Sequence, residues 1–200
     1  MAAVTAYNRI MKSENATVPD KTAPDKAIPD TRTVIRAAKA SDVPPILAFI
    51  RELAAYEREP DAVIATEERL LADGFGPTPL FHCLMAERDG RAVGFALYFY
   101  NYSTWLGRPG LYLEDMFVQP QFRGLGIGKT LLKEVALIAR ARGCVRMQWE
   151  VLDWNTTAIE FYRAMGAEFL DQWRNVRLGD SALIKLAAGE TTRSTEEAKR

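Results

Sequence analysis

The spacing of hydrophobic and polar residues divides the chain into short strands and longer helices. Runs that are rich in β-branched and aromatic residues, or in which apolar and polar residues alternate, predict strands. These strands are expected at residues 33–37, 81–87, 92–100, 145–152, 169–178 and 182–186, with a further, buried strand that starts at Leu111. Apolar residues at helical spacing predict four helices, which begin after Ser41, at Thr66, in the glycine-rich segment before Ile127 and after Asn155.

Turn and cap residues set the limits of these elements. Ser41 and Asn155 are expected N-caps, because a short side-chain oxygen can accept a hydrogen bond from the first turn of a helix. Asp89-Gly90 predicts a tight turn between two strands, and residues 101–110 are expected to form a loop. The order is strand, two helices, three strands, helix, strand, helix and final strands. We therefore expect an α/β fold with a mixed central sheet and helices on both faces.

The two ends of the chain differ in composition from the middle. Residues 1–32 are poor in aliphatic side chains and repeat proline with aspartate, which leaves no apolar face to bury. We expect a disordered leader there; a transit peptide is the alternative, although the acidic residues dilute the basic character that such signals need. The folded domain is expected at 33–187, followed by a flexible tail at 188–200.

Composition and charge narrow the possible functions. The 200 residues are 48% hydrophobic, which suits one globular domain. Basic and acidic residues both number 26, so no basic field favours nucleic acid or an anionic membrane, and a small-molecule partner is expected. Cys83 and Cys144 lie far apart beside apolar runs, which predicts reduced core thiols in a cytoplasmic protein. With one histidine, His82, in a structural role and no Cys/His cluster, we expect no metal site.

Three glycines, each two residues after the last, precede the helix that follows the central strand. Gly124, Gly126 and Gly128 lack a Cβ, so backbone N–H groups can close on a phosphate at the positive end of a helix. A nucleoside-triphosphate loop would need a glycine where Arg123 stands, and a dinucleotide fingerprint would need a different spacing near the start of a βαβ unit. The segment therefore favours another phosphate-bearing ligand.

The pattern Arg123-x-x-Gly126-x-Gly128 resembles the pyrophosphate loop of the GNAT acetyltransferases, which bind acetyl-CoA. The stretch from Asp153 to Tyr162 resembles a second block of the same superfamily. Further blocks are similar to the diamine acetyltransferases, the spermidine/spermine and thialysine N-acetyltransferase group: RELAAYE at 51–57, DGFG at 73–76, FHCL at 81–84 and LYLED at 111–115. The resemblance covers residues 34–186. It implies the GNAT fold, acetyl-CoA as co-substrate, a small-molecule amine as acceptor and a homodimer with C-terminal strands exchanged or packed between subunits.

The resemblance also implies roles for individual residues. The pantetheine of acetyl-CoA would pair with the backbone of the central strand, and its pyrophosphate would lie on the glycine-rich loop. Cofactor contacts are therefore expected at Met116, Phe117, Val118, Arg123, Gly124, Leu125, Gly126, Ile127, Gly128, Lys129, Asn155, Thr156, Thr157, Ala158 and Tyr162. The amine is expected to bind among Tyr56, Glu57, Trp105, Glu114, Gln148, Trp149 and Glu150.

Acetyl transfer from a thioester to an amine requires a neutral amine and a proton for the departing thiolate. An amine with a pKa near 10.4 is only about one part in a few thousand neutral at pH 7, which costs about 4 to 5 kcal/mol. Glu114 is the candidate base, directly or through a water molecule, because partial burial on a strand raises the pKa of a carboxyl. Tyr162 matches the family's candidate acid, since a phenol can donate its proton to the thiolate. A backbone N–H freed where strands diverge could hold the thioester oxygen.

One position departs from the family pattern. Polyamine acetyltransferases carry an acidic residue two positions before the tryptophan of the loop that precedes the central strand, and here that position is Ser103, ahead of Trp105. The missing carboxylate weakens the prediction of a long polycation as substrate. An antibiotic, an amino-acid α-amine or a protein N-terminus stays open as the acceptor, as does a non-catalytic sensor that binds acyl-CoA.

Overall fold

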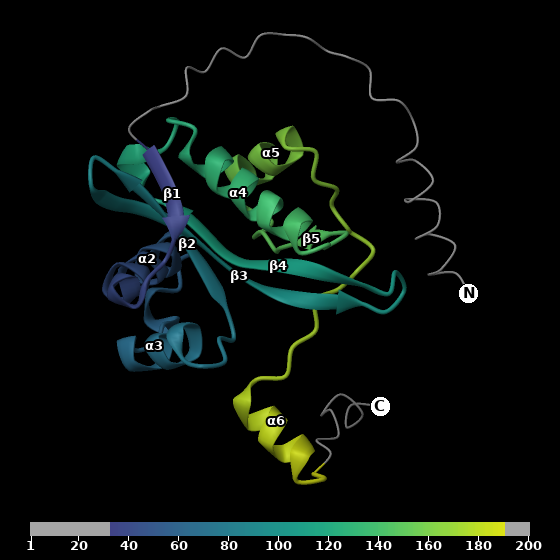
Figure 1. Ribbon diagram of the computed structural model, residues 1–200. Coiled ribbons are helices and arrows are strands. Elements are labelled where there is room, and N and C mark those ends of the chain that lie inside the picture. Colours follow the sequence, from purple (N-terminus) through teal and green to yellow (C-terminus); the bar gives the residue numbers. More distant parts are fainter. Residues whose placement is uncertain (1–32, 191–200) are drawn as a thin grey trace, which may run out of the picture. The chain divides into compact units, whose positions relative to one another are not determined.

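The structure, a computed structural model, describes residues 33–190 (Figure 1). These residues form two compact units, one within Met1–Glu150 and the other within Val151–Arg200. The first unit contains the sheet, and the second contains helices α5 and α6. The predicted leader at 1–32 and residues 191–200 of the predicted tail lie outside the described residues.

A five-stranded mixed sheet forms the centre of the first unit, with its strands in the order β1-β2-β3-β4-β5. The strands are β1 (Thr33–Ala37), β2 (His82–Arg88), β3 (Arg91–Ser103), β4 (Arg108–Val118) and β5 (Met147–Gln148). Neighbours from β1 to β4 are antiparallel, whereas β5 lies parallel to β4. The predicted mixed α/β architecture is confirmed. So is the turn at Asp89-Gly90, whose φ angles of 50° and 77° suit a tight hairpin between β2 and β3.

Helices cover both faces of this sheet (Figure 1). In the first unit, α2 (Val43–Tyr56) packs on one face, α4 (Ile127–Ala141) packs on the opposite face, and α3 (Glu67–Phe75) packs beside α2. Three short 3-10 helices connect these elements: η1 (Ala40–Asp42), η2 (Pro60–Ala62) and η3 (Pro120–Phe122). The second unit contains α5 (Thr156–Ala164) and α6 (Asp180–Ala187).

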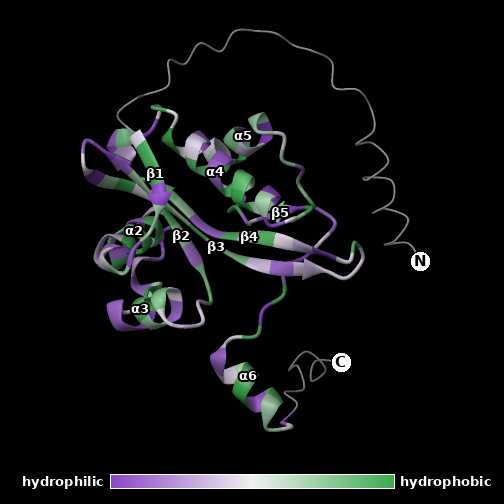
Figure 2. Ribbon diagram, viewed as in Figure 1, coloured by the Kyte–Doolittle hydropathy of each residue, from purple (hydrophilic) through white to green (hydrophobic). Residues whose placement is uncertain are grey.

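Aromatic packing ties α2 to the middle of the sheet. The Phe49 ring stacks on Phe95 at a centroid distance of 5.9 Å and lies 6.2 Å from the ring of Phe117 on β4. The remaining buried members of this core are Ile46, Cys83, Met85 and Leu97. On α4, hydrophobic residues alternate with polar ones (Figure 2), and Ile127, Leu131, Leu132, Val135 and Ala139 are buried. The central part of β4 is therefore held from both sides, which fixes the strand that carries the candidate base.

Two strand predictions beside the central strand need correction. The loop expected at 101–110 is wrong: β3 runs to Ser103 and β4 starts at Arg108, so only residues 104–107 turn. Cross-strand pairing, which no single segment reveals, extends both strands. The strand expected at 145–152 shortens to Met147–Gln148, because the parallel pairing between β4 and β5 ends at Tyr112 and Gln148.

The C-terminal strand predictions are wrong. Residues 169–178 form neither strand nor helix, and residues 182–186 lie within helix α6. Alanine, leucine and lysine are good helix formers, Asp180 lies in the first turn and Lys185 in the last, where each charge suits the helix dipole. A strand would have needed a pairing partner, whereas a helix satisfies its own backbone hydrogen bonds.

Of the two predicted N-caps, Asn155 is confirmed and Ser41 is wrong. The Asn155 side chain accepts a hydrogen bond from the Ala158 N–H at 3.3 Å, which confirms it as the N-cap of α5. The helix expected to start at Thr66 is α3, and the Thr66 side chain is its N-cap, accepting a hydrogen bond from the Arg69 N–H at 3.3 Å. Ser41 is not the cap of α2, because it lies within η1 and Asp42 precedes the helix. The Asp42 carboxylate accepts from the Lys39 N–H and from the Arg36 guanidinium, so an ion pair fixes this turn.

Candidate active site

The candidate site begins where β4 and β5 separate. The two strands are in register at Leu111 with Met147 and at Tyr112 with Gln148, and the Leu111 N–H donates to the carbonyl of Arg146 at 3.1 Å. Beyond this point β4 continues to Val118, while residues 149–150 leave the sheet. One backbone edge of β4 is therefore not paired with β5 from Leu113 onward. A ligand with amide groups could add to such an edge as an extra strand does.

A β-bulge at Glu114 interrupts the strand beside this opening. Leu97 of β3 pairs with Asp115 and Tyr98 pairs with Leu113, so Glu114 has no partner across the ladder. A bulge adds one residue to one strand, locally raises the twist and directs a side chain away from its regular position. The bulge also frees local backbone groups from the regular ladder. Such groups could serve as the oxyanion donors expected where strands diverge.

Glu114 belongs to a group of carboxyls whose pKa values are raised above the ordinary range. It is an exposed residue, yet partial desolvation, followed by repulsion from Glu150, raises the pKa of its carboxyl. Asp115 is more deeply placed: burial first, then repulsion from Glu114 and Glu57, raises its pKa to about 6. Desolvation also raises the pKa of Glu57 at the end of α2. A carboxyl with a pKa of about 6, such as that of Asp115, can accept and return a proton near physiological pH.

Tyr112 links β4 to the segment that follows β5, close to the carboxyls of Glu114 and Glu150. Its hydroxyl donates a hydrogen bond to Glu150 at 3.0 Å, and its ring stacks on Phe99 with centroids 5.2 Å apart. Burial, the bond to Glu150 and the charge of Glu114 raise the pKa of this phenol to about 12. Tyr112 therefore remains a neutral donor that orients Glu150.

The glycine-rich loop leads from β4 through η3 into α4. Gly124 and Gly126 both have φ of 78°, a left-handed conformation that disfavours any residue with a Cβ. A Cβ built on either glycine would meet nothing within 4 Å, so backbone conformation and not crowding requires glycine. Gly126 is the N-cap of α4 and offers no side-chain cap. The positive end of the helix dipole is therefore available to an anion, in contrast to α3 and α5, where side chains cap the first turn.

Arg123 holds this loop against the protein. Its Nε donates to the Val118 carbonyl at 3.0 Å, and its guanidinium lies 4.8 Å from the ring centre of Tyr56 and 5.6 Å from that of Phe117. These contacts join the end of α2, the end of β4 and the start of the loop. The amine side that was predicted at Tyr56 and the phosphate side that was predicted at Arg123 are thus in direct contact.

Comparison with known proteins identifies the architecture. Residues 46–167 match the family model of the Acetyltransferase (GNAT) family. The chain therefore belongs to the GNAT family. A thialysine N-epsilon-acetyltransferase of Bos taurus is 45% identical over 165 residues, which cover 77% of this chain and 96% of that protein. A spermidine/spermine N(1)-acetyltransferase-like protein 1 of Homo sapiens is 41% identical over 76% of this chain and 23% of its own length.

Solved structures agree with this GNAT assignment at the level of the fold. An integron cassette protein from the mobile metagenome of V. cholerae superposes with a TM-score of 0.67 and 27% sequence identity. The match covers 78% of this chain and 98% of that one. The predicted GNAT fold and the assignment to the diamine acetyltransferase group are thus confirmed, and the protein is an N-acetyltransferase by family.

The first unit brings most of the predicted GNAT site residues onto β4 and its surroundings. Met116, Phe117 and Val118 lie on β4, and residues 123–129 form the loop and the start of α4. Gln148 lies on β5 opposite Tyr112, followed directly by Trp149 and Glu150. Trp105 is an exposed residue of the turn between β3 and β4. Asn155, Thr156, Thr157, Ala158 and Tyr162 belong to the second unit, where they form the cap and body of α5, and Tyr162 is buried.

Sequence reasoning missed Asp115 as a site residue. Strand alternation places neighbouring residues on opposite faces, so the residue beside Glu114 would have been assigned to the core. Asp115 does lie on the face of Phe117, but it is a carboxyl near the end of α2, where Glu57 repels it. Tyr112 was also missed. Its position two residues before Glu114 was the available signal.

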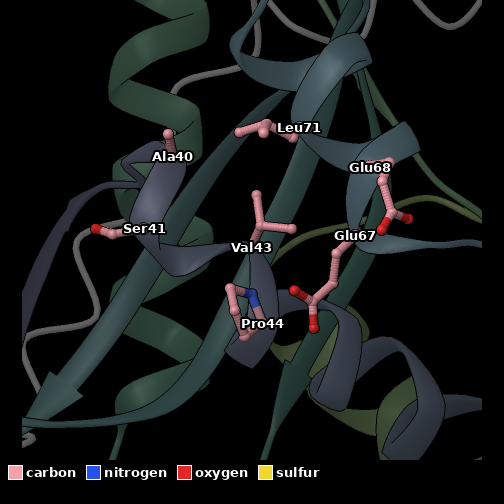
Figure 3. A pocket seen from close by; sticks show the side chains of 7 residues that line it. All are labelled: Ala40, Ser41, Val43, Pro44, Glu67, Glu68 and Leu71. Carbon is pink, nitrogen blue, oxygen red and sulfur yellow. The ribbon is translucent and has the colours of Figure 1, made fainter.

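A separate groove lies at the start of α2 (Figure 3) and has a volume of about 320 Å³. Its lining residues are Ala40, Ser41, Val43, Pro44, Glu67, Glu68 and Leu71. None of the predicted site residues lines it. The groove therefore does not belong to the candidate active site.

Residues 33–190 contain neither a candidate metal centre nor a membrane-spanning helix. No group of three or more histidine, cysteine, aspartate or glutamate side chains there could hold a metal ion. Over the same residues, every helix is too short or too polar to cross a membrane. Cys83 and Cys144 are buried free thiols, and burial raises the pKa of Cys83 to about 12, which suppresses its reactivity.

Proposed function

We propose that this protein transfers the acetyl group of acetyl-CoA directly to a primary amine of a small diamine, a polyamine or a thialysine-like amino acid. The observation that carries the proposal is the bulge at Glu114, between an open strand edge and a helix that begins with left-handed glycines. The similarity to thialysine and spermidine/spermine acetyltransferases supports the choice of amines. Three carboxyls near β4, those of Glu114, Asp115 and Glu150, suit a cationic acceptor.

The residues on the loop and on β4 fit acetyl-CoA, which supplies the acetyl group as an activated thioester. Open space beside Gly124 and Gly126 and the uncapped start of α4 suit the pyrophosphate. The β4 backbone at Met116, Phe117 and Val118 would hold the pantetheine, and residues 123–129 the phosphates. Asn155, Thr156, Thr157 and Ala158 are further proposed contacts of the cofactor.

The proposed proton transfers use two side chains. Glu114 takes the proton of the bound ammonium, directly or through a water molecule, and its raised pKa brings it closer to that of the amine. Tyr162 then gives its proton to the thiolate. Tyr56, Glu57, Trp105, Gln148, Trp149 and Glu150 surround the amine. No metal takes part in this scheme, because the thioester is already activated.

Two further parts of the proposal concern the cellular location and the oligomeric state of the enzyme. Buried reduced thiols at Cys83 and Cys144 support a cytoplasmic protein. Leu183, Ile184 and Leu186 on α6 expose 54%, 61% and 54% of their surface, which supports burial against a second copy in a homodimer. Neither nucleic acid nor a membrane is a proposed partner.

A direct test combines coenzyme A binding with a panel of amines. Calorimetry should detect coenzyme A binding, and mass detection should find acetylated product from thialysine, lysine, spermidine or putrescine. If only an antibiotic or a peptide N-terminus is acetylated, the enzyme is an acetyltransferase for another class of amine. Coenzyme A binding without any product would favour an acyl-CoA sensor, and no binding would remove the proposed chemistry altogether.

Replacement of Gly126 by alanine should raise the Kd for coenzyme A about tenfold, because a left-handed alanine costs about 1 to 2 kcal/mol. The variant loop would relax, and binding would have to restore its conformation. Gly90→Ala is the matched control, since Gly90 has φ of 77° and equal open space but lies in the β2–β3 turn. Calorimetry should therefore give an unchanged Kd for Gly90→Ala. An unchanged Kd for Gly126→Ala would exclude a role of the loop conformation in binding.

A further inference from the structure

Glu52 on α2 is hydrogen-bonded to Gln119, the residue that directly follows β4. The Gln119 Nε2 lies 3.0 Å and 3.3 Å from the two carboxylate oxygens of Glu52 and donates to them. The contact is partly buried and joins residues 67 positions apart. A hydrogen bond to a charged group is stronger than one between neutral groups. Such a contact can fix the position of the less rigid of the two segments that it joins.

The less rigid segment is the turn that contains η3. This 3-10 helix has three residues and is closed by a hydrogen bond from the Phe122 N–H to the Gln119 carbonyl at 2.9 Å. Short 3-10 helices have poorer hydrogen-bond geometry than α-helices, and residues 123–126, which follow, are exposed. Helix α2, by contrast, has 14 residues and packs on the sheet. We therefore expect α2 to set the position of the turn.

Gln119 connects the Glu52 carboxylate to the backbone and side chains of the turn. Its own N–H donates to the Val93 carbonyl on β3 at 3.0 Å, and its Oε1 accepts from the Gln121 Nε2 at 3.3 Å. A carboxylate can only accept, so Glu52 determines that the amide nitrogen of Gln119 faces α2. The amide oxygen is then left to hold Gln121, the middle residue of η3.

A second contact from the same face of α2 holds the other end of the turn. Tyr56 follows Glu52 by four residues, so the two side chains lie on one face of the helix. The Arg123 guanidinium lies 4.8 Å from the ring centre of Tyr56. Glu52 and Tyr56 thus hold Gln119 and Arg123, the residues on either side of η3. The glycine-rich loop departs directly from this segment.

From these contacts we infer that Glu52 is a positioning residue for coenzyme A. Through Gln119 it holds η3 so that the backbone N–H groups of residues 124–128 keep the arrangement that receives the phosphates. Without this contact the loop would become ordered only on binding, which lowers affinity. The proton transfers proposed for Glu114 and Tyr162 use neither side chain, so they should continue. This inference rests on the proposed function and adds a residue that supports its cofactor site.

The test measures the Kd for coenzyme A by calorimetry in Glu52→Ala, Gln119→Ala and the double variant. Each single change should raise the Kd about 5- to 10-fold, as expected for a lost hydrogen bond to a charged group. The double variant should bind no more weakly than either single one, because both changes remove the same contact. Glu52→Gln keeps an accepting oxygen and should stay within about threefold of the unaltered protein. In steady-state assays, the KM for acetyl-CoA should rise while kcat at saturation is retained.

Arg51→Ala is the matched control, since Arg51 is the exposed neighbour of Glu52 on α2 and its loss should leave the Kd unchanged. Melting temperatures without coenzyme A report the stability of each variant separately. If Glu52→Ala melts earlier but keeps its Kd, or if the two single effects add in the double variant, the inference is wrong and the proposed function survives. If the unaltered protein binds no coenzyme A, both are wrong.

Discussion

Replacement of Glu114 by glutamine should lower kcat/KM at pH 7 about 100- to 1000-fold, because the amide cannot accept the proton of the bound ammonium. The unaltered enzyme should gain activity with rising pH as the Glu114 carboxyl, whose pKa is raised, loses its proton. The variant should lack this titration. Its activity should instead increase toward the pKa of the free amine, near 10.4, where the amine is itself neutral. Rates measured from pH 5 to pH 10 test both parts.

Glu67→Gln provides the control for this variant. Glu67 is an exposed carboxylate in the first turn of α3, outside the candidate site, and its loss should leave the pH profile unchanged. Calorimetry should give the same Kd for coenzyme A in all three proteins. A Glu114→Gln variant that keeps the acid limb of the profile would assign that limb to another group, and Asp115, with its pKa of about 6, would be the first to test.

Removal of the Tyr162 hydroxyl should lower kcat about 100-fold, because the thiolate would have to take its proton from water. The Tyr162→Phe variant keeps the ring and therefore the packing of α5, so coenzyme A affinity should change less than twofold. Stopped-time assays with thialysine and calorimetry with coenzyme A measure the two quantities separately.

Tyr98→Phe is the matched control for the loss of kcat that is expected in Tyr162→Phe. Tyr98 is also a buried tyrosine, with 6% of its surface exposed against 8% for Tyr162, and burial raises its pKa to about 12. Loss of its hydroxyl should affect the melting temperature without lowering kcat. If Tyr162→Phe turns over as fast as the unaltered enzyme, the acid is some other group and Tyr162 serves packing alone.

Local chemistry explains why part of this molecule could be predicted from its sequence. The Asn155 cap, the Asp89-Gly90 turn and the left-handed glycines before α4 each depend on a few neighbouring residues whose conformational preferences are strong. The sheet followed from strands separated by short connections, which seldom cross. These features needed no knowledge of distant contacts.

The features that were missed depend on partners far away in the sequence. The bulge at Glu114 is visible only in the pairing of β4 with β3, and the pKa of Asp115 is raised mainly by burial in the folded protein, with smaller contributions from Glu114 and Glu57. The early end of β5 depends on where β4 parts from it. For residues 182–186, an alternating pattern suited a strand, but helix-forming residues and charges at both ends favoured α6.

Because of the bulge on β4, the residue that is proposed as the catalytic base is not one that the pairing of the sheet requires. Leu113 and Asp115 pair with adjacent residues of β3 and so face opposite sides of the sheet, as immediate neighbours would in a regular strand. Glu114 is therefore a supernumerary residue: without it, every side chain that β4 buries would keep its orientation. Natural or directed evolution could exchange or delete this residue and retain a folded scaffold for a different reaction.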